Sequence, residues 1–247
     1  MNTKVDIKET VMNLQVVCKD IDAAWKSWYD IMKNIVLSNY KSIDSRDGEV
    51  AAEIINATTV IEDPTRCFLK SKIRKLPIRY AIGELLWYLS GNNSLEAIQL
   101  ITNNWDNLSD DGKTVNSNYG YVIQNEKGFN QFDYCYELLK KEPTTRQAII
   151  HIKTPVNTLE NPTKDLNCTV YCQFFIRDGK LHMITHMRSN DLWLGFPYDV
   201  FQFTCMQILM AMKLGVKLGK YTHVVDSLHL YMRDYEKAIE AESELEA

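Results

Sequence analysis

The sequence lacks the features that would direct it into or across a membrane. No apolar run approaches the roughly 20 residues that a membrane-spanning helix requires. The N-terminal segment, MNTKVDIKETVMNLQ, is charged and has no uninterrupted apolar core of the kind found in a signal peptide. We therefore expect a cytoplasmic protein with no membrane partner.

The chain also lacks an excess of basic residues. Its 28 Lys and Arg are outnumbered by 32 Asp and Glu, which gives a formal net charge of −4. Surfaces that bind nucleic acid normally carry a basic excess. This balance of charge argues against a nucleic-acid partner.

The six cysteines form no CxxC pair, so a disulfide framework is not expected and a reducing compartment is favoured. Cys168 and Cys172 lie four apart in NCTVYCQFF, which is predicted as a strand, too far apart along it to bond easily. Together with His182 and His186 on the next strand they could form a metal site. Ordinary strand residues are the simpler interpretation, and no metal is expected.

The hydrophobic pattern predicts one α+β domain over residues 1–247. Hydrophobic residues make up 45% of the chain, enough for one substantial core, and no internal repeat or low-complexity linker interrupts it. Helices are expected where apolar residues recur at helical spacing, and strands where β-branched and aromatic residues alternate. The predicted helices are 20–37, two within 78–101 with Ser94 as a cap, 131–143, 200–216 and an acidic solvated helix or tail at 234–247, and the predicted strands are 48–63, 146–155, 168–176, 181–189 and 222–231.

Two local signals stand out within this pattern. Asp178-Gly179 lies between two strand-like runs and predicts a tight hairpin turn. Asp199 directly precedes the apolar run 200–216, with Gln202 three residues later. The sequence DVFQ is typical of a helix capping box, so Asp199 either caps this helix or recognises a ligand.

Polar residues recur along the chain in a specific order and local context. They are Glu84 in GELLWYL, Trp105-Asp106, NSNYG at 116–120, Arg146 after EPTT, Cys168 in LNCT, RSND at 188–191, GFPYD at 195–199 and His229-Leu230-Tyr231. This order, which covers the chain up to Tyr231, resembles the thymidylate synthase family. Within the family, NSNYG, Thr169, Met187 and Asp199 resemble the phage-type deoxycytidylate (dCMP) 5-hydroxymethylases. The resemblance implies a mixed β-sheet flanked by helices, a sheet-mediated homodimer, and a location in the host cytoplasm if a phage encodes the chain.

Cys168 matches the family's catalytic cysteine, whose thiolate attacks C6 of a pyrimidine and makes C5 electron-rich. Cysteine suits this step because a modest lowering of its pKa gives a strong nucleophile at neutral pH; Arg188 would supply the positive field. The alternative is a buried strand cysteine. The resemblance makes Glu84 an acid/base that acts through water, and places Tyr119 near the C5 proton. Glu84 could instead lie on an exposed helix face.

The resemblance also implies how the nucleotide is held. Arg46, Arg188 and Ser189 would bind the phosphate from one subunit, and Arg146 would reach in from the partner, since arginine offers a rigid fork of donors. Arg46 and Arg146 could also be solvated surface charges. The family usually has two consecutive arginines where this chain has Arg146-Gln147, which leaves one phosphate contact in doubt.

The remaining matched residues concern the sugar, the base and the folate. His229 and Tyr231 alternate on the last predicted strand and resemble the pair that holds the sugar 3′-hydroxyl. Asn190 and Asp191 are expected to line the base pocket, partly through backbone groups. The implied co-substrate is 5,10-methylenetetrahydrofolate, bound by Trp105, Asp106 and Gly195.

Asp199 occupies a position where thymidylate synthases have asparagine. An ionised carboxylate only accepts hydrogen bonds, so it matches the amino group at C4 of cytosine and repels the carbonyl at C4 of uracil. Asparagine would cap the helix equally well, so capping alone does not explain the acid. We therefore expect Asp199 to select a cytosine nucleotide.

The expected activity is hydroxymethylation of dCMP by methylenetetrahydrofolate and water. Thymidylate synthases carry a longer C-terminal region that closes over the folate and excludes water, whereas this chain ends about sixteen residues after Tyr231. The family histidine after the cysteine is replaced by Thr169. A 5-methyltransferase acting on dCMP or dUMP, a CMP 5-hydroxymethylase and a non-catalytic nucleotide-binding homologue remain alternatives.

Overall fold

The computed structural model describes residues 11–38, 42–43, 48–156 and 158–244. Its contacts divide the chain into two compact units. The first unit comprises residues 1–76, 187–205 and 219–247, and the second comprises residues 77–186 and 206–218. The single domain predicted over residues 1–247 stays a prediction.

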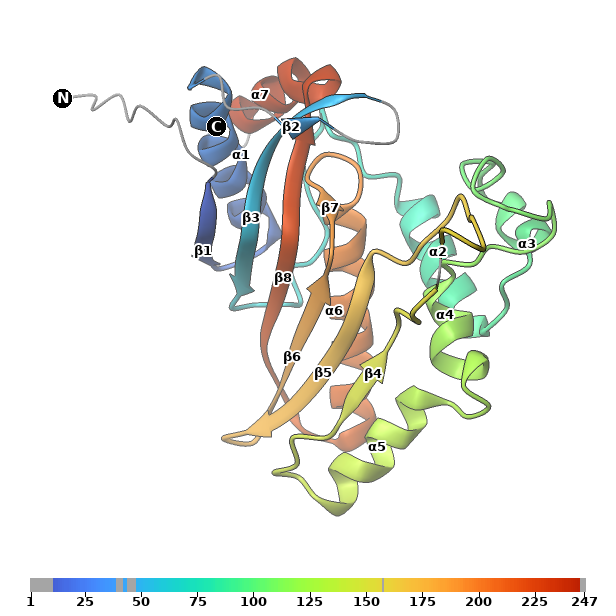
Figure 1. Cartoon of the computed structure of the whole chain (residues 1–247). Coiled ribbons are helices and arrows are strands. Elements are labelled where there is room, and N and C mark those ends of the chain that lie inside the picture. Colours follow the sequence, from blue (N-terminus) through green and yellow to red (C-terminus); the bar gives the residue numbers. More distant parts are fainter. Residues whose placement is uncertain (1–10, 39–41, 44–47, 157, 245–247) are drawn as a thin grey trace. The chain divides into compact units, whose positions relative to one another are not determined.

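The first unit contains most of the long strands (Figure 1). Its elements are β1 (Met12–Cys18), α1 (Ile21–Leu37), β2 (Ser42–Ile43), β3 (Val50–Ile61), β7 (Asn190–Asp191), the first part of α6 (Phe196–Leu214), most of β8 (Lys217–Tyr231), a 3-10 turn η2 (Met232–Asp234) and α7 (Tyr235–Glu244). Strand β3 lies between β1 and β8, parallel to β1 and antiparallel to β8, while β7 runs parallel to β8. The sheet is therefore mixed, as the resemblance implied.

Strand β1 was not predicted from the sequence. Its register with β3 pairs Met12 with Ile55 and Leu14 with Ala57, which leaves Asn13 and Asn56 opposite each other. Both asparagines have positive φ, 60° and 58°, and the Asn56 amide donates to Asn13 Oδ1 at 2.8 Å. Asparagine tolerates this left-handed conformation better than most residues, so the irregularity weakened the alternating pattern that predicts a strand.

Helix α1 covers one face of β1 and β3. It begins after Asp20, whose side chain accepts from the backbone N–H of Ala23 at 3.1 Å as an N-cap. Trp25 and Trp28 are fully buried on its inner face, and the Trp28 indole donates to Thr59 on β3 at 2.8 Å. Helix α7 packs against α1 with Ala238 and Ala241 fully buried. Of the predicted acidic solvated helix or tail, the described residues form a helix, and one face of it is packed and not solvated.

The second unit combines a three-stranded sheet with several helices. Its elements are α2 (Ile78–Ser90), α3 (Leu95–Gln99), α4 (Tyr119–Tyr121), a π-helix η1 (Val122–Glu126), α5 (Gln131–Lys141), β4 (Ile149–His151), β5 (Thr169–Arg177), β6 (Lys180–Met187) and the last part of α6. The strand order is β6-β5-β4, with β4 antiparallel to β5. Asp178 and Gly179 form the predicted hairpin turn, with φ of 51° and 69°, as a type I′ turn requires.

Two boundaries differ from the sequence expectation in ways that matter for function. Strand β5 begins at Thr169, so Cys168 lies just before the strand and not on it. Helix α6 begins at Phe196, four residues earlier than predicted, so Asp199 lies inside its first turn. Proline is well tolerated in a first helical turn, and Pro197 therefore did not mark a boundary here.

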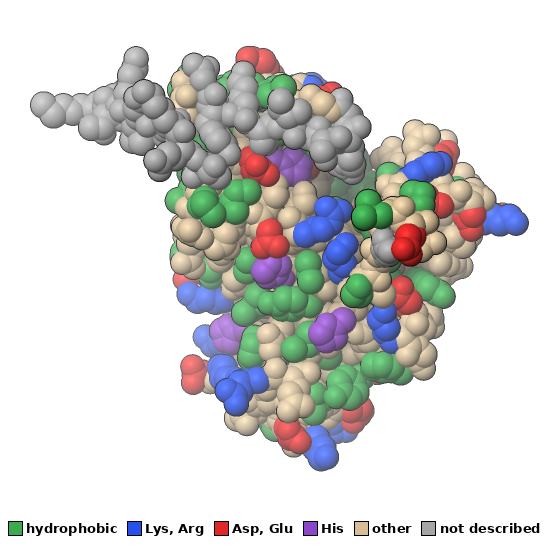
Figure 2. All heavy atoms as spheres, viewed as in Figure 1, with side chains coloured by type: hydrophobic (Ala, Val, Ile, Leu, Met, Phe, Trp, Pro, Cys, Tyr) green, Lys and Arg blue, Asp and Glu red, His purple; other side chains and the backbone are tan. Residues whose placement is uncertain are grey.

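The face of the molecule drawn in Figure 2 carries charges of both signs. Over the described part of the visible face, Lys and Arg side chains are interspersed with Asp and Glu, and histidines lie over the strands (Figure 2). Among the described helices, none is both long and apolar enough to span a membrane.

Candidate functional site

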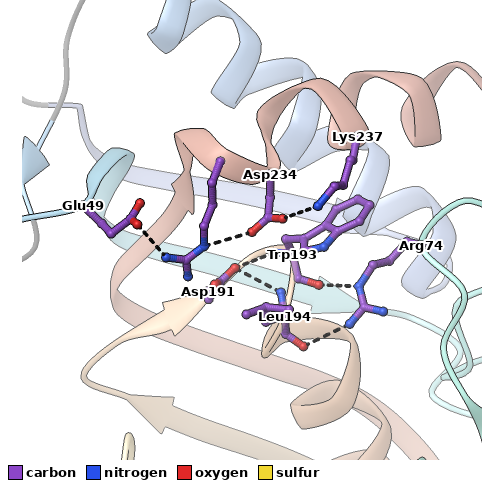
Figure 3. Close-up of polar contacts among 8 residues, drawn as sticks. Glu49, Arg74, Asp191, Trp193, Leu194, Asp234 and Lys237 are labelled. Atoms are coloured by element: carbon purple, nitrogen blue, oxygen red, sulfur yellow. Dashed lines mark hydrogen bonds and ion pairs between the residues drawn. The ribbon is translucent and has the colours of Figure 1, made fainter. Parts of the chain in front are cut away.

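The segment that leads into α6 is a tightly held turn in the first unit (Figure 3). Asp191 Oδ1 accepts from the backbone N–H groups of Trp193 and Leu194 at 2.7 and 3.0 Å. Arg74 donates to the carbonyl oxygens of the same two residues, at 2.6 Å for Trp193 and 3.4 Å for Leu194. The turn is therefore fixed through both its N–H and its C=O groups.

Arg74 was missed by the sequence analysis. Only 8% of the residue is exposed, and its guanidinium lies 5.4 Å from the ring centre of Trp193 and 5.5 Å from that of Tyr198. In the sequence it stands among lysines in KSKIRKL, which is typical of a solvated surface. No local signal distinguishes it, because its partners lie about 120 residues later in the chain.

Asp191 is held in a partly desolvated setting. Burial raises the pKa of this carboxyl, while its bond to the Leu194 N–H and the nearby His229 act to lower it. Its carboxylate shapes the turn, and a contact of this residue with a base stays a prediction.

The backbone before Asp199 approaches its side chain closely. A Cβ at Gly195 would lie 2.8 Å from the Asn190 amide nitrogen and 3.3 Å from Asp199 Oδ2, so glycine is required for this packing. The Asp199 N–H donates to the Gly195 carbonyl at 2.9 Å, which is an ordinary intrahelical bond. Asp199 is thus not the N-cap of α6, and the capping-box interpretation was wrong.

Asp199 Oδ2 instead accepts from the Asn190 side-chain amide at 2.7 Å. Asn190 is 4% exposed, and Asp199 is half-buried. The first turn of a helix also favours negative charge. This arrangement holds Asp199 as a hydrogen-bond acceptor.

Most residues expected at the phosphate and sugar lie either directly before β7 in the sequence or on the neighbouring strand β8. Asp191 on β7 pairs in register with His229 on β8, and the rings of His229 and Tyr231 meet edge to face at 5.0 Å. Arg188 and Ser189 are half-buried just before β7. Arg46 lies outside the described residues.

Glu84 lies on α2 in the second unit and is 5% exposed, so the exposed-helix interpretation of this residue was wrong. The hydroxyls of Tyr80 and Tyr88 both donate to its Oε1 at 3.2 Å. A buried carboxyl is costly unless it is hydrogen-bonded, and these phenols meet that need.

Tyr119 is brought next to the Glu84 group through Tyr88, since the Tyr88 and Tyr119 rings lie 5.5 Å apart. Tyr119 begins α4, where the Asn118 side chain accepts from the Tyr121 N–H at 2.7 Å as an N-cap. A Cβ at Gly120 would lie 2.0 Å from the Tyr88 carbonyl oxygen. The NSNYG motif is therefore explained by a cap and a close approach of α4 to α2.

Cys168 ends the loop that precedes β5. Its thiol is half-buried and lies 3.9 Å from the Leu166 carbonyl oxygen. Asp165 in the same loop accepts from the Ser117 N–H at 2.7 Å, which ties the loop to NSNYG. Cys172, in contrast, is fully buried on β5, 3.6 Å from the Thr185 hydroxyl. Of the two, only Cys168 is partly accessible.

Trp105 and Asp106 carry features that a ligand could use. The Trp105 ring packs on Trp87 at 5.5 Å, and the indole N–H groups of both are buried without a hydrogen-bond partner among the described residues. Asp106 is exposed and accepts from Gln99 at 2.9 Å. Unpartnered buried donors are uncommon in folded proteins and are consistent with a missing acceptor.

Arg146 is exposed and, with Gln147, lines a hollow of the second unit together with Phe129, Tyr134 and His151. Among the described residues no group of three or more His, Cys, Asp or Glu could hold a metal ion. The structure thus brings together Asn190, Asp199 and Gly195 in the first unit, and Glu84 and Tyr119 through Tyr88 in the second.

Comparisons with known proteins agree with the fold. Over 200 residues the chain is 34% identical to a deoxyuridylate hydroxymethyltransferase of Bacillus phage SP01, covering 76% of this chain and 52% of that protein. It is 32% identical over 169 residues to a thymidylate synthase of Bacillus atrophaeus, covering 65% of this chain and 73% of that protein. The crystal structure of thymidylate synthase from T4 phage has the same fold, with a TM-score of 0.74, 23% identity, and coverage of 87% of this chain and 79% of that one.

The chain spans about half the length of the phage relative, and 60% of the thymidylate synthase 1 of Bacillus spizizenii. The family model described as thymidylate synthase matches a longer part of this chain, residues 26–245. The order of motifs, the mixed sheet and these matches agree: the chain belongs to the thymidylate synthase family.

Proposed function

We propose that this chain transfers a one-carbon unit from 5,10-methylenetetrahydrofolate to C5 of deoxycytidylate, and that water completes the reaction to give 5-hydroxymethyl-dCMP. Membership of the family supports folate-dependent transfer to a pyrimidine nucleotide. The relative from Bacillus phage SP01 supports hydroxymethylation as the outcome. The observation that carries the choice of base is the Asp199 carboxylate, held as an acceptor by Asn190.

Asp199 favours cytosine for an electrostatic reason. Its Oδ2 already accepts from an amide N–H, and in the proposal the carboxylate is ionised and can only accept. Such a group accepts from the exocyclic amino group of cytosine and repels the carbonyl oxygen that uracil presents at the same position. A buried unpaired acceptor costs about 1–3 kcal/mol, so one such mismatch favours one base over the other by about fivefold to 150-fold.

Cys168 is the nucleophile in this proposal. Its thiolate forms a bond to C6, and the C5–C6 π electrons make C5 nucleophilic; the sulfur leaves again when the C5–C6 double bond is restored. The half-buried thiol at the end of a loop fits this role better than the enclosed Cys172.

Glu84 handles protons through water. Two phenol donors on Oε1 fix the orientation of its carboxyl. In that orientation it can protonate the folate nitrogen as that nitrogen leaves the methylene carbon now bonded to C5, and later take a proton from the water that attacks this carbon. In the proposal Tyr119, whose ring lies beside that of Tyr88, acts on the C5 proton.

The folate supplies a carbon at the oxidation level of formaldehyde. The buried indole N–H of Trp105, which has no hydrogen-bond partner in the described part of the chain, fits an acceptor on the pterin of the folate, and the exposed Asp106 fits a pterin N–H donor. Gly195 contributes by leaving room beside Asp199. The bound nucleotide would be held by Arg188, Ser189, His229 and Tyr231, with Arg46 and a partner's Arg146 at the phosphate.

The test is the mass of the product formed from dCMP, CMP and dUMP in separate incubations with methylenetetrahydrofolate. A hydroxymethyl product from dCMP, formed faster than any product from the other two, supports the proposal. A methyl product, or preference for CMP, would assign the corresponding transferase. Trapping of Cys168 by a 5-fluoropyrimidine nucleotide with folate distinguishes an enzyme from a nucleotide-binding homologue, which would form no adduct.

Hydroxymethylation of dUMP is the second candidate, because the SP01 relative is described as acting on deoxyuridylate. The variant Asp199→Asn separates the two. Its amide can both donate and accept, so the ratio of kcat/KM for dCMP over dUMP should fall at least tenfold. A wild-type preference for dUMP would assign the second function, whereas a preference for dCMP that Asp199→Asn leaves unchanged would remove Asp199 from base selection.

A further inference from the structure

Behind Asp199 lies a row of buried polar side chains that the roles above leave unexplained. Asn190 Oδ1 is 3.1 Å from His223 Nε2, and His223 Nδ1 is 2.7 Å from the Tyr221 hydroxyl. Tyr221 and His223 are both 0% exposed. We call Tyr221, His223 and Asn190 the buried polar chain; it ends on Asp199, and all four residues belong to the first unit.

Secondary structure places these residues in a line. Tyr221 and His223 are two apart on β8 and so share one face, and Asn190 lies on β7, which pairs with β8. The His223 ring is fixed edge-on against Phe196, the first residue of α6, at 5.4 Å. The imidazole therefore links the strand to the helix that carries Asp199.

The chemistry of the partners sets the direction of each hydrogen bond. An ionised carboxylate only accepts, so the Asn190 NH2 faces Asp199 and its oxygen faces His223. An amide oxygen also only accepts, so His223 Nε2 carries a proton. In the neutral imidazole Nδ1 then accepts from the Tyr221 hydroxyl. Every donor in the buried polar chain thus points toward Asp199.

Hydrogen bonds aligned in this way polarise one another, and burial strengthens each of them. The last donor meets the carboxylate at 2.7 Å, in the range of a charge-assisted bond. The alignment stabilises the ionised form of Asp199 and fixes the orientation of its carboxylate.

We propose that Tyr221, His223 and Asn190 are positioning residues that keep Asp199 an ionised, singly oriented acceptor, and that base selectivity depends on this buried polar chain as well as on Asp199. The proposal rests on the proposed role of Asp199 in reading cytosine. It adds Tyr221 and His223, which are fully buried and reach Asp199 only through Asn190.

The test compares the ratio of kcat/KM for dCMP over dUMP in four variants. His223→Phe keeps a flat ring but removes both nitrogens, so the ratio should fall about tenfold. Tyr221→Phe removes only the most distant donor, and a fall of about threefold is expected. His223→Gln can place an amide N–H where Nε2 lies, and should restore the ratio to within about threefold of wild type.

The matched control is Tyr29→Phe in the same unit. Tyr29 is 1% exposed, and its hydroxyl has no hydrogen-bond partner among the described residues. This variant also removes one buried phenol hydroxyl, yet it should leave the ratio unchanged. Equal ratios in wild type, His223→Phe and Tyr221→Phe would overturn the proposal, as would a loss in His223→Phe that His223→Gln does not reverse.

A second measurement does not depend on the substrate. In nucleotide-free protein labelled with ¹⁵N-histidine, His223 should be the neutral tautomer with the proton on Nε2; its signal is identified by its absence in His223→Gln. A proton on Nδ1 would reverse the direction of the hydrogen bonds in the buried polar chain and overturn the proposal. If wild type does not turn over dCMP but His223 shows the Nε2–H tautomer, the proposed function fails while the polarised chain stands.

Discussion

Asp191 and Asp199 show how context divides the tasks of two like residues. Asp191 precedes helix α6, and Asp199 lies in its first turn. Asp191 Oδ1 accepts from two backbone N–H groups of a turn, whereas Asp199 Oδ2 accepts from the side-chain amide of Asn190. The Asp191 carboxylate therefore shapes the backbone of the turn, whereas the Asp199 carboxylate is oriented by the Asn190 amide. Sequence alone identified both as acids of interest without separating these roles.

The pKa of Asp191 leads to a prediction about stability. Because burial raises its pKa in the folded protein, the charged form is disfavoured by folding. The stability contribution of Asp191 is then present below its unfolded pKa and is lost as the pH rises through its folded pKa. Asp191→Asn keeps an acceptor for the turn but cannot ionise.

The free energy of unfolding of wild type minus that of Asp191→Asn should therefore decrease as the pH rises from the ordinary carboxyl range through the raised pKa, and then level off. Urea unfolding at a series of pH values measures this difference, in which other titrating groups cancel. A difference that stays flat or increases with pH would contradict the assignment.

Cys168 and Cys172 provide a matched pair for the proposed nucleophile. Cys168→Ala should abolish the 5-fluoropyrimidine adduct and turnover with little effect on stability. Cys172→Ala should keep adduct formation and turnover. It should lose about 1–2 kcal/mol of unfolding free energy, because it leaves a small cavity beside Thr185. Intact-protein mass spectrometry and urea unfolding check the two variants. Adduct formation that survives in Cys168→Ala would remove this residue from the mechanism.

At the scale of elements, helix caps account for where α1 and α3 begin. Asp20 caps α1 through Oδ1 and forms an ion pair with Arg66 through Oδ2 at 2.8 Å. Ser94 caps the five-residue α3 with a longer bond of 3.4 Å to Ala97. Both caps follow from local sequence, since Asp and Ser are favoured at this position.

The two caps should differ in strength. Asp20→Ala is expected to cost about 1–2 kcal/mol of unfolding free energy, because it removes the cap of a long buried helix and the partner of Arg66. Asp20→Asn, which keeps the cap, should cost less, and Ser94→Ala should cost under about 1 kcal/mol. Urea unfolding compares the three. An equal loss in Asp20→Ala and Asp20→Asn would assign the effect to the ion pair.

The strands β4 and β1 mark the limit of pattern reading at this scale. Strand β4 has three residues where ten were predicted, and β1 was missed because Asn13 interrupts its alternation. The hairpin at Asp178-Gly179 was confirmed because its turn type depends on those two residues alone. Neighbouring residues alone predict a turn type, whereas the extent of a strand depends on the strand with which it pairs.

At the scale of the whole molecule, the family implies a homodimer in which Arg146 acts in the partner's site. Its exposure in the second unit is consistent with such a role. Sedimentation should then give twice the chain mass of 28.7 kDa. Arg146→Ala should raise the KM for the nucleotide without changing this mass.

Mixing Cys168→Ala, which lacks the nucleophile, with Arg146→Ala, which binds the nucleotide weakly, tests the shared site directly. A hybrid dimer of Cys168→Ala and Arg146→Ala contains one site with an intact cysteine and an intact partner arginine. Random exchange of equal amounts should therefore restore about a quarter of wild-type activity at low nucleotide concentration. Self-mixed samples of each variant are the controls. No gain on mixing, with hybrids present by native mass spectrometry, would place Arg146 within its own subunit's site.

The amino-acid sequence by itself determined the α+β class, the family and the chemical kinds of residue that the proposed function needs. These follow from hydrophobic periodicity and from the order of motifs, and both can be read from the sequence without knowing which residues are in contact. Only the tertiary structure decided that Asp199 lies inside a helix, that Arg74 fixes the turn before it, and that His223 stands behind Asn190. The reason is physical: each of the last two depends on a hydrogen bond between residues 33 or more positions apart, and no local pattern encodes such a partner.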